Sequence, residues 1–118
     1  MNKDDLISKV LYLPSQFRIR GNISMISLLK ESGYFEMYDQ VNEAEITKAL
    51  NEHPECINDW IMLSEDKRCS SGWYITENEN GKYIVGYYPA EEFEITEYCD
   101  VKEACAAFIK LEIEAIRN

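Results

Sequence analysis

Length and charge already restrict what this chain can do. It has 118 residues, the length of one domain, and its 22 Asp and Glu against 12 Lys and Arg give a formal net charge of -10 at pH 7. Binding to nucleic acid or to an anionic membrane surface needs a surplus of cations, so both classes of function are disfavoured. We expect one domain over residues 1–118, with a charge that favours rapid capture of a basic partner.

The chain begins with a helical pattern. Residues 4–13 carry apolar side chains at helical spacing, with acids in the first turn, which predicts a short helix. Pro14, directly after it, and Pro54, further along, are expected to end helices. Residues 17–20 alternate apolar and basic side chains, which favours a short edge strand or an extended linker.

Two further helices are indicated by the residues at their ends. Asn22 can cap a helix over residues 23–32, which Gly33 then ends. Asn42, followed three residues later by Glu45, resembles a capping box and predicts a third helix that ends near residue 51 or 52. The first half of the chain is therefore expected to be mainly helical.

The second half changes to strand patterns. The continuous apolar run at residues 60–63 predicts a strand covered on both faces. Residues 72–76 and 83–88 are rich in aromatic and β-branched side chains, and Asn80-Gly81 between them is a strong hairpin-turn signal. Residues 93–96 alternate apolar and polar side chains, which is typical of a strand with its apolar side chains turned inward and one solvated face.

The chain closes with a long helix. Asp100 with Glu103 resembles a second capping box, and apolar spacing predicts a helix from residue 101 to about residue 117. Together these patterns predict an α+β fold in two layers. A four-stranded, mostly antiparallel sheet is expected, with the N-terminal helices and the long C-terminal helix packed on it.

Glu112 lies near the middle of the apolar face of that last helix. A carboxylate buried there without compensation would be costly. Either the helix overhangs the sheet and Glu112 reaches water, or Glu112 forms a buried pair with an arginine. The candidate arginines are Arg18, Arg20 and Arg68.

No residue pattern predicts catalysis, a cofactor or a metal site. The cysteines Cys56, Cys69, Cys99 and Cys105 include no Cys-x-x-Cys pair, and His53 is the only histidine. Free, packed thiols are therefore expected rather than a zinc site or a Cys–His nucleophile. The five glycines are isolated, so there is no glycine-rich phosphate loop, and no two carboxylates are marked as an acid–base pair.

Nothing in the sequence indicates a membrane or secreted protein. No segment reaches the roughly 18 apolar residues that a membrane span needs. The acids at positions 4 and 5 are wrong for a secretory signal. A cytoplasmic location is expected.

The negative charge has a definite place in the sequence. Residues 1–40 hold five acids and five bases, so all of the -10 lies in residues 41–118, and residues 91–103 hold six acids against Lys102 alone. An acidic, partly aromatic surface suits a cationic protein partner. The candidate partner-binding residues are the acids Glu91, Glu92, Glu94 and Glu97, the loop residues Glu65 and Asp66, and the tyrosines Tyr87 and Tyr88.

Each of these features also has a structural explanation. The helix dipole favours acids near a helix N-terminus, and a mixed-charge loop such as residues 64–72 is usually solvated. Tyrosines on strands often pack in the core. Aromatic residues on an outer sheet face could equally form a homodimer surface, although a monomer is favoured.

Three stretches resemble a known group of proteins. The sequences W-I-M-L-S-E-D-K-R at residues 60–68, S-S-G-W-Y at 70–74 and Y-I-V-G-Y-Y-P at 83–89 resemble small bacterial proteins. Some of these are similar to immunity proteins of toxin–immunity systems, including contact-dependent growth inhibition. The resemblance implies a small acidic α+β domain that is not an enzyme and that binds a cognate toxin one to one.

The charge is consistent with that implication. A toxin that cuts nucleic acid must be cationic to hold phosphates, and a strongly acidic inhibitor can mimic the polyanion. The expected function is therefore an immunity protein that neutralises a basic nuclease toxin domain. The alternatives are a cytoplasmic adaptor or small-molecule-binding module without catalytic activity, and an enzyme with an unrecognised site.

Overall fold

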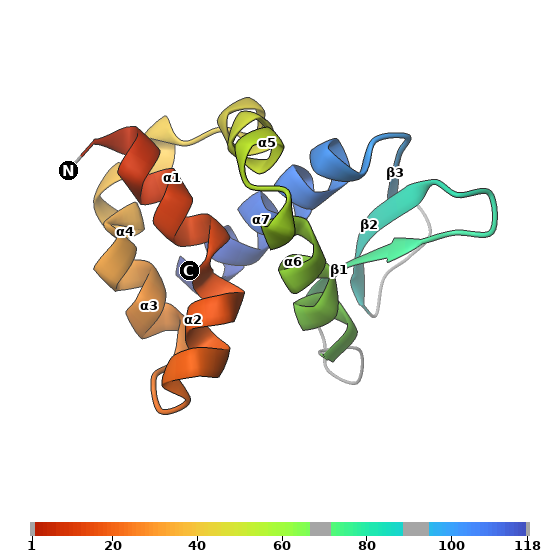
Figure 1. Cartoon of the computed structure of the whole chain (residues 1–118). Helices are drawn as coiled ribbons and strands as arrows, with labels where there is room; N and C mark the ends of the chain where they lie inside the picture. Colours follow the sequence, from red (N-terminus) through yellow and green to blue (C-terminus); the bar gives the residue numbers. More distant parts are fainter. Residues whose placement is uncertain (1, 67–71, 89–94, 118) are drawn as a thin grey trace.

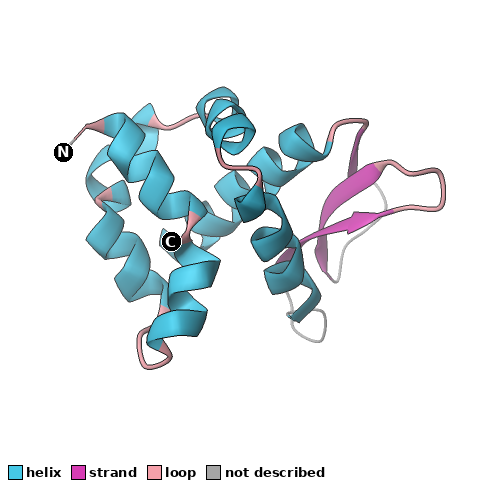
Figure 2. Cartoon of the chain, in the orientation of Figure 1, coloured by secondary structure: helices cyan, strands magenta, loops and turns pink. Residues whose placement is uncertain are grey.

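The computed structural model describes residues 2–66, 72–88 and 95–117. The helices are α1 (Lys3–Leu11), α2 (Leu13–Arg20), α3 (Met25–Ser32), α4 (Tyr34–Met37), the 3-10 helix η1 (Tyr38–Gln40), α5 (Glu43–Glu52), α6 (Glu55–Asp66) and α7 (Val101–Arg117). The strands β1 (Gly72–Glu77), β2 (Tyr83–Tyr88) and β3 (Thr96–Tyr98) form one antiparallel sheet in the order β1-β2-β3. The predicted α+β class is confirmed, with helices at one end of the molecule and the sheet at the other (Figures 1 and 2).

The long helix α7 joins the two ends of the molecule. It contacts α3, α5 and α6 as well as all three strands (Figure 1). Its side chains from Ala104 to Ile109 are all buried, which is the pattern of a helix covered on every side. The core therefore lies around α7. Within the described stretches, no helix is long and apolar enough to cross a bilayer.

The predicted helix starts at α5 and α7 are confirmed by their capping bonds. The Asn42 side chain accepts from the Glu45 amide at 2.9 Å, and the Glu45 carboxylate accepts from the Asn42 amide at 3.2 Å. These two bonds complete the capping box. At the start of α7, the Asp100 carboxylate accepts from the Lys102 amide at 2.7 Å. All three bonds are local, so the sequence alone could predict these helix starts.

The predicted hairpin is present, and so is the helix predicted over residues 23–32, which is α3 and begins later than predicted. β1 and β2 pair antiparallel on either side of the turn that contains Asn80-Gly81. Gly33 ends α3 in the left-handed conformation, with φ 91°. The cap at the start of α3 is Ser24, whose hydroxyl accepts from the Ser27 amide at 3.2 Å, so the helix begins later than a cap at Asn22 would place it.

The predicted strand at residues 60–63 is wrong, because these residues belong to α6 and the described sheet has three strands rather than four. Cys56, Trp60 and Ser64 recur at four-residue spacing and are all buried, so they form the inner stripe of a helix. Met62 is 41% exposed, whereas a strand covered on both faces would bury it. The apolar run is too short to distinguish the two periods by itself.

Residues 17–20 form the end of α2 rather than a strand or an extended linker. Pro14 lies in the first turn of α2, where backbone amides have no acceptor within the helix. The amide proton that proline lacks therefore costs the helix no hydrogen bond. Pro14 therefore opens the second helix as well as following the first. Pro54 behaves in a similar way, since α5 ends at Glu52 as predicted and α6 begins directly after the proline.

Among the described residues, the last predicted strand, 93–96, overlaps β3 only at Thr96. β3 covers Thr96–Tyr98, and residues 93 and 94 lie outside the described residues. Pairing with β2 sets the register of β3 and places Tyr98 opposite Tyr83. Ile95, which was expected to turn inward, precedes the strand and is 38% exposed.

Glu112 is only 7% exposed, so the expectation that it reaches water from an overhanging helix end is wrong. The C-terminal half of α7 is enclosed by the N-terminal helices and does not project beyond the fold. Two of the candidate arginines have other partners: Arg18 pairs with Asp59 at 2.8 Å and Arg20 with Glu31 at 3.1 Å. The third, Arg68, lies outside the described residues.

Ser64 closes the free edge of β1. Its hydroxyl accepts from the Ile75 amide at 2.9 Å and donates to the Ile75 carbonyl at 3.2 Å, in place of the neighbouring strand that an edge lacks. Ser64→Ala removes the partner of both backbone groups, so we expect the free energy of unfolding in urea to fall by about 1–3 kcal/mol. Ser8→Ala on α1 is the control, because the Ser8 hydroxyl makes no hydrogen bond within the described residues. An equal loss from both variants would contradict this role.

Candidate functional site

The sheet has one face against the helices and one face turned away from them (Figure 1). Ile75 and Val85 lie opposite each other on β1 and β2 and are buried in the core. Because side chains alternate along a strand, their neighbours lie on the other face. We call this the outer sheet face, and it comprises Gly72, Tyr74 and Thr76 of β1, Ile84, Gly86 and Tyr88 of β2, and Glu97 of β3.

Gly86 allows Tyr74 to cover the outer sheet face. The two residues are paired across β1 and β2, and a Cβ added at Gly86 would lie 2.8 Å from the Tyr74 hydroxyl oxygen. The Tyr74 ring thus fills the space that a side chain would take, a known way to restore packing over a strand glycine. Tyr88, which is 54% exposed, is the diagonal neighbour of Tyr74. The outer sheet face therefore carries two tyrosines, on adjacent strands.

The structure separates the two tyrosines that were predicted as anchors. Tyr88 shares the outer sheet face with Glu97, but Glu97 lies opposite Ile84, so the two candidates are four residues apart along β2. Tyr87 points to the opposite face, where its ring meets Trp73 edge-on with the centroids 5.1 Å apart. Tyr87 and Tyr88 therefore cannot contact the same flat partner surface.

The predicted acidic residues are also dispersed. Glu65 is exposed in the last turn of α6, and Asp66 ends that helix, so neither lies in a loop between two strands as expected. Their place follows from the helical period of α6, which the short apolar run concealed. The remaining acidic candidates, Glu91, Glu92 and Glu94, lie outside the described residues.

Acidic side chains gather at β3 from three elements. Glu97 accepts from the Asn78 side-chain amide at 3.1 Å and pairs with Lys82 at 3.4 Å. Burial raises the pKa of Tyr98, and the negative charges of Glu43 and Glu103 raise it further. Helix dipoles account for Glu43 and Glu103, which lie in the first turns of α5 and α7. Sequence analysis missed Glu43 because α5 is far from β3 in the sequence, and only the tertiary fold brings Glu43 near it.

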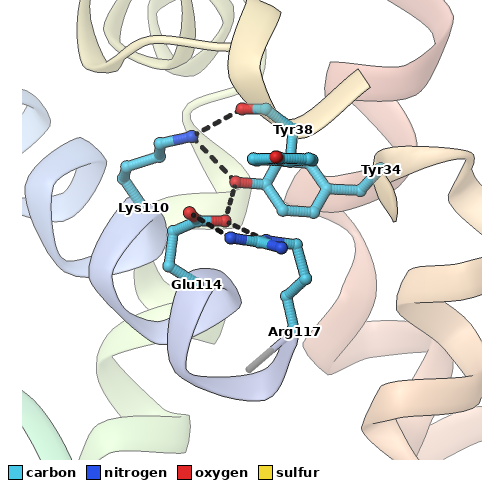
Figure 3. Close-up of polar contacts among 5 residues, drawn as sticks. All are labelled: Tyr34, Tyr38, Lys110, Glu114 and Arg117. Atoms are coloured by element: carbon cyan, nitrogen blue, oxygen red, sulfur yellow. Dashed lines mark hydrogen bonds and ion pairs between the residues drawn. The ribbon is translucent and has the colours of Figure 1, made fainter. Parts of the chain in front are cut away.

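A polar cluster joins α4 to the end of α7 (Figure 3). The Tyr34 hydroxyl donates to Glu114 at 2.6 Å and accepts from Lys110 at 2.8 Å. Arg117 pairs with Glu114 at 3.0 Å and lies over the Tyr38 ring, 3.8 Å from its centroid. Burial raises the pKa of Tyr34 and lowers the pKa of Lys110. Because every member contacts another member, we assign the cluster a structural role in holding α4 against α7.

Tyr34→Phe is expected to lower the free energy of unfolding by about 1–3 kcal/mol at neutral pH, because Glu114 and Lys110 lose a partner. Burial acts to raise the pKa of Glu114, but hydrogen bonds from Arg117 and Tyr34, with the positive charges of Lys110 and Arg117, outweigh it and hold the pKa below its ordinary value. A carboxyl group with a lowered pKa stabilises the fold above its unfolded pKa and loses that contribution as the pH falls. Urea unfolding should therefore show a smaller deficit below about pH 4. Tyr38→Phe, which keeps the ring under Arg117, is the control.

The histidine lies in a polar cluster that does not activate a cysteine. The Tyr12 hydroxyl donates to Glu55 at 2.7 Å and lies 3.3 Å from His53 Nδ1. This hydrogen bond raises the pKa of Tyr12 and lowers the pKa of Glu55. Cys56, next along the chain, is buried, and burial raises the pKa of its thiol to about 11. A nucleophilic cysteine needs the opposite shift, so this cluster gives no support to thiol catalysis.

The other described cysteines differ from each other. Cys105 is buried in α7, and burial raises the pKa of its thiol to about 12. Cys99 is exposed, so the expectation that it packs as part of a strand is wrong. Cys69 lies outside the described residues. Among the residues that are described, no group of three or more His, Cys, Asp or Glu side chains could hold a metal ion.

A pocket of about 360 Å³ lies between α1, α2 and α3. Its volume falls in the range of small-molecule sites, roughly 300–1,000 Å³. Leu13 and Leu28 form part of its lining, together with Lys9, Arg20 and Glu31. Arg20 is engaged by Glu31, which leaves Lys9 as a cation with no ion pair in the described stretches. This pocket is the candidate site for a small-molecule function.

Comparison with known proteins gives no relative from which to transfer a function. No protein-family model, no curated protein and no solved structure matches this chain. The structure itself defines a small, acidic α+β domain whose outer sheet face carries exposed aromatic and acidic side chains.

Proposed function

We propose that this chain is a cytoplasmic immunity protein that binds and neutralises a cognate toxin domain. The observation that carries the proposal is the outer sheet face, which carries Tyr74, Tyr88 and Glu97 in a chain of net charge -10. Tyrosine is enriched among the residues that dominate binding energy, because a large rigid ring loses little conformational entropy. An acidic side chain on the same face, Glu97, adds attraction to a cationic partner.

The charge distribution supports a basic nuclease as the toxin class. All of the -10 lies in residues 41–118, which include the whole sheet, α6 and α7. A nuclease domain presents cations to phosphates, so the acidic half of this chain is electrostatically complementary to it. Such complementarity accelerates association and orients the encounter.

Inhibition by surface occupation needs no chemistry from the inhibitor itself. The raised pKa of the Cys56 thiol is consistent with this, since a protonated thiol is a poor nucleophile. We therefore assign no catalytic residue, cofactor or metal to the proposed function.

The proposal is tested by rescue of growth. The toxin encoded by the adjacent reading frame is expressed with and without this chain, and an inactive toxin variant is used for purification. We expect this chain to restore growth and to co-purify with the toxin domain at one-to-one stoichiometry. Absence of both rescue and co-purification would overturn the proposal.

A second candidate, a small-molecule-binding module, is favoured only by the pocket that contains Lys9 and Arg20. Because Arg20 is paired with Glu31, Lys9 is the cation that points to a small anion with an apolar body as the ligand class. A panel of aromatic carboxylates should then raise the melting temperature of the wild-type chain but not of Lys9→Ala. No shift with any compound would count against this candidate and leave the toxin proposal untouched.

A further inference from the structure

The groove between α2 and α6 is a second apolar surface, separate from the outer sheet face. It has a volume of about 320 Å³, and its apolar lining includes Phe17, Met25, Met62 and Leu63. α2 and α6 lie next to each other, at the lower side of the molecule in Figure 1. Phe17 is 40% exposed and Met62 is 41% exposed, so each wall of the groove presents a large apolar side chain to solvent.

The groove is electrically neutral, unlike most of the chain. Among the described residues that line it, the charged ones are Arg18 of α2 and Asp59 of α6, which form an ion pair at 2.8 Å. Two copies of a chain with net charge -10 repel each other, and the repulsion is strongest where their acidic halves meet. Contact through a neutral face keeps those halves apart. In a two-fold dimer, the cation of each copy can also face the anion of the other copy, so a face with one of each is complementary to itself.

We propose that this groove is a self-association surface, occupied by the same groove of a second copy of this chain. In such an isologous contact, Phe17 and Met62 of one copy cover the corresponding pair of the other. Arg18 can then pair with Asp59 of the second copy as well as with its own. Methionine suits this position, because its flexible side chain adapts to an irregular partner surface. The dimer departs from the expected monomer and leaves the outer sheet face open.

Sedimentation equilibrium of the full chain, over a dilution series at low and high salt, tests this proposal. We expect a reversible monomer–dimer equilibrium that becomes tighter at high salt, because salt screens the repulsion between the two copies while the apolar contact persists. Binding to a basic toxin should respond to salt in the opposite direction. Failure of the dimer and failure of the proposed function are therefore distinguishable.

Met62→Lys is the decisive variant. It reduces the net negative charge, which by itself favours association, but it places an ammonium group in the apolar contact. We expect the dimer dissociation constant to rise at least about tenfold. Asp59 and Glu65 lie three residues to either side on α6, so the new lysine has local partners and the fold should be retained.

The controls separate the groove from general effects. Ile19→Ser changes a residue on α2 that is 73% exposed but lies on the opposite side of the helix from Phe17, and it should leave the equilibrium unchanged. Phe17→Ser replaces Met62→Lys if circular dichroism shows that the lysine variant is unfolded. A chain that stays monomeric at the highest concentration and salt, or a dimer indifferent to the groove variants, overturns the proposal. The same holds if the groove variants abolish toxin binding without changing the oligomeric state.

Discussion

Replacing Trp60 with alanine is expected to lower the free energy of unfolding by about 3–5 kcal/mol, a large part of the stability of a domain this small. The Trp60 side chain is fully buried, and its ring meets that of Phe108 edge-on with the centroids 6.1 Å apart. The indole nitrogen also donates to the Leu11 carbonyl at 2.9 Å. Trp60 thus ties α6 to both α1 and α7. Denaturant unfolding followed by circular dichroism measures the loss.

Trp60→Phe is the control for this prediction. Phenylalanine keeps an aromatic ring against Phe108 but lacks the donor to Leu11, so it should recover much of the loss. If the alanine and phenylalanine variants were equally stable, the packing of Trp60 would not be central to the fold.

Tyr88→Ala is expected to weaken toxin binding by about 2 kcal/mol, a factor of about thirty in the dissociation constant, with little change in melting temperature. The stability is spared because Tyr88 is 54% exposed on the outer sheet face. Surface plasmon resonance against an inactive toxin domain measures the effect. Tyr87→Ala is a closely matched control, because the adjacent ring lies on the opposite face of the sheet. Comparable losses from the two variants would exclude the outer sheet face as the contact.

Glu97→Lys tests the electrostatic part of the same contact. Reversing this charge should slow association with the toxin and flatten the dependence of the rate on salt. Glu36→Lys changes the net charge equally, but it lies on α4 in the neutral first part of the chain. Equal effects of the two variants would show that only the total charge matters.

The elements that sequence analysis predicted correctly each have a complete local signal. The capping box at Asn42 and Glu45 begins α5, the Asn80-Gly81 turn closes the β1–β2 hairpin, and Asp100 caps α7. Each signal acts over a few neighbouring residues, so no knowledge of the rest of the chain is needed.

Each element that was predicted incorrectly has a sequence pattern that fits both a helix and a strand. The apolar run at residues 60–63 fits a buried strand, and only the wider spacing of Cys56, Trp60 and Ser64 shows a helix. Residues 17–20 alternate like a strand, but Pro14 begins a helix that includes them. In both cases a proline at the helix start was the available signal, since Pro14 lies in the first turn of α2 and Pro54 directly precedes α6.

The candidate site was predicted in part. Tyr88 and Glu97 were both candidates, and the register of the sheet brings them to one face. Tyr74 was missed, although Gly86 gives a signal for it, because a glycine inside a strand often marks the close approach of another group. Which strand face turns outward depends on where α6 and α7 pack, and no local pattern records that.

The sequence by itself determined the net charge of -10, its confinement to residues 41–118, and the helices and hairpin that have local caps and turns. The tertiary structure alone decided that Ser64 closes the edge of β1, that Tyr34 meets Glu114, and that Glu112 is buried. The physical reason is the separation along the sequence over which each kind of interaction acts. Caps and turns are satisfied by backbone groups a few residues away, whereas burial is set by which distant surfaces are removed from water together.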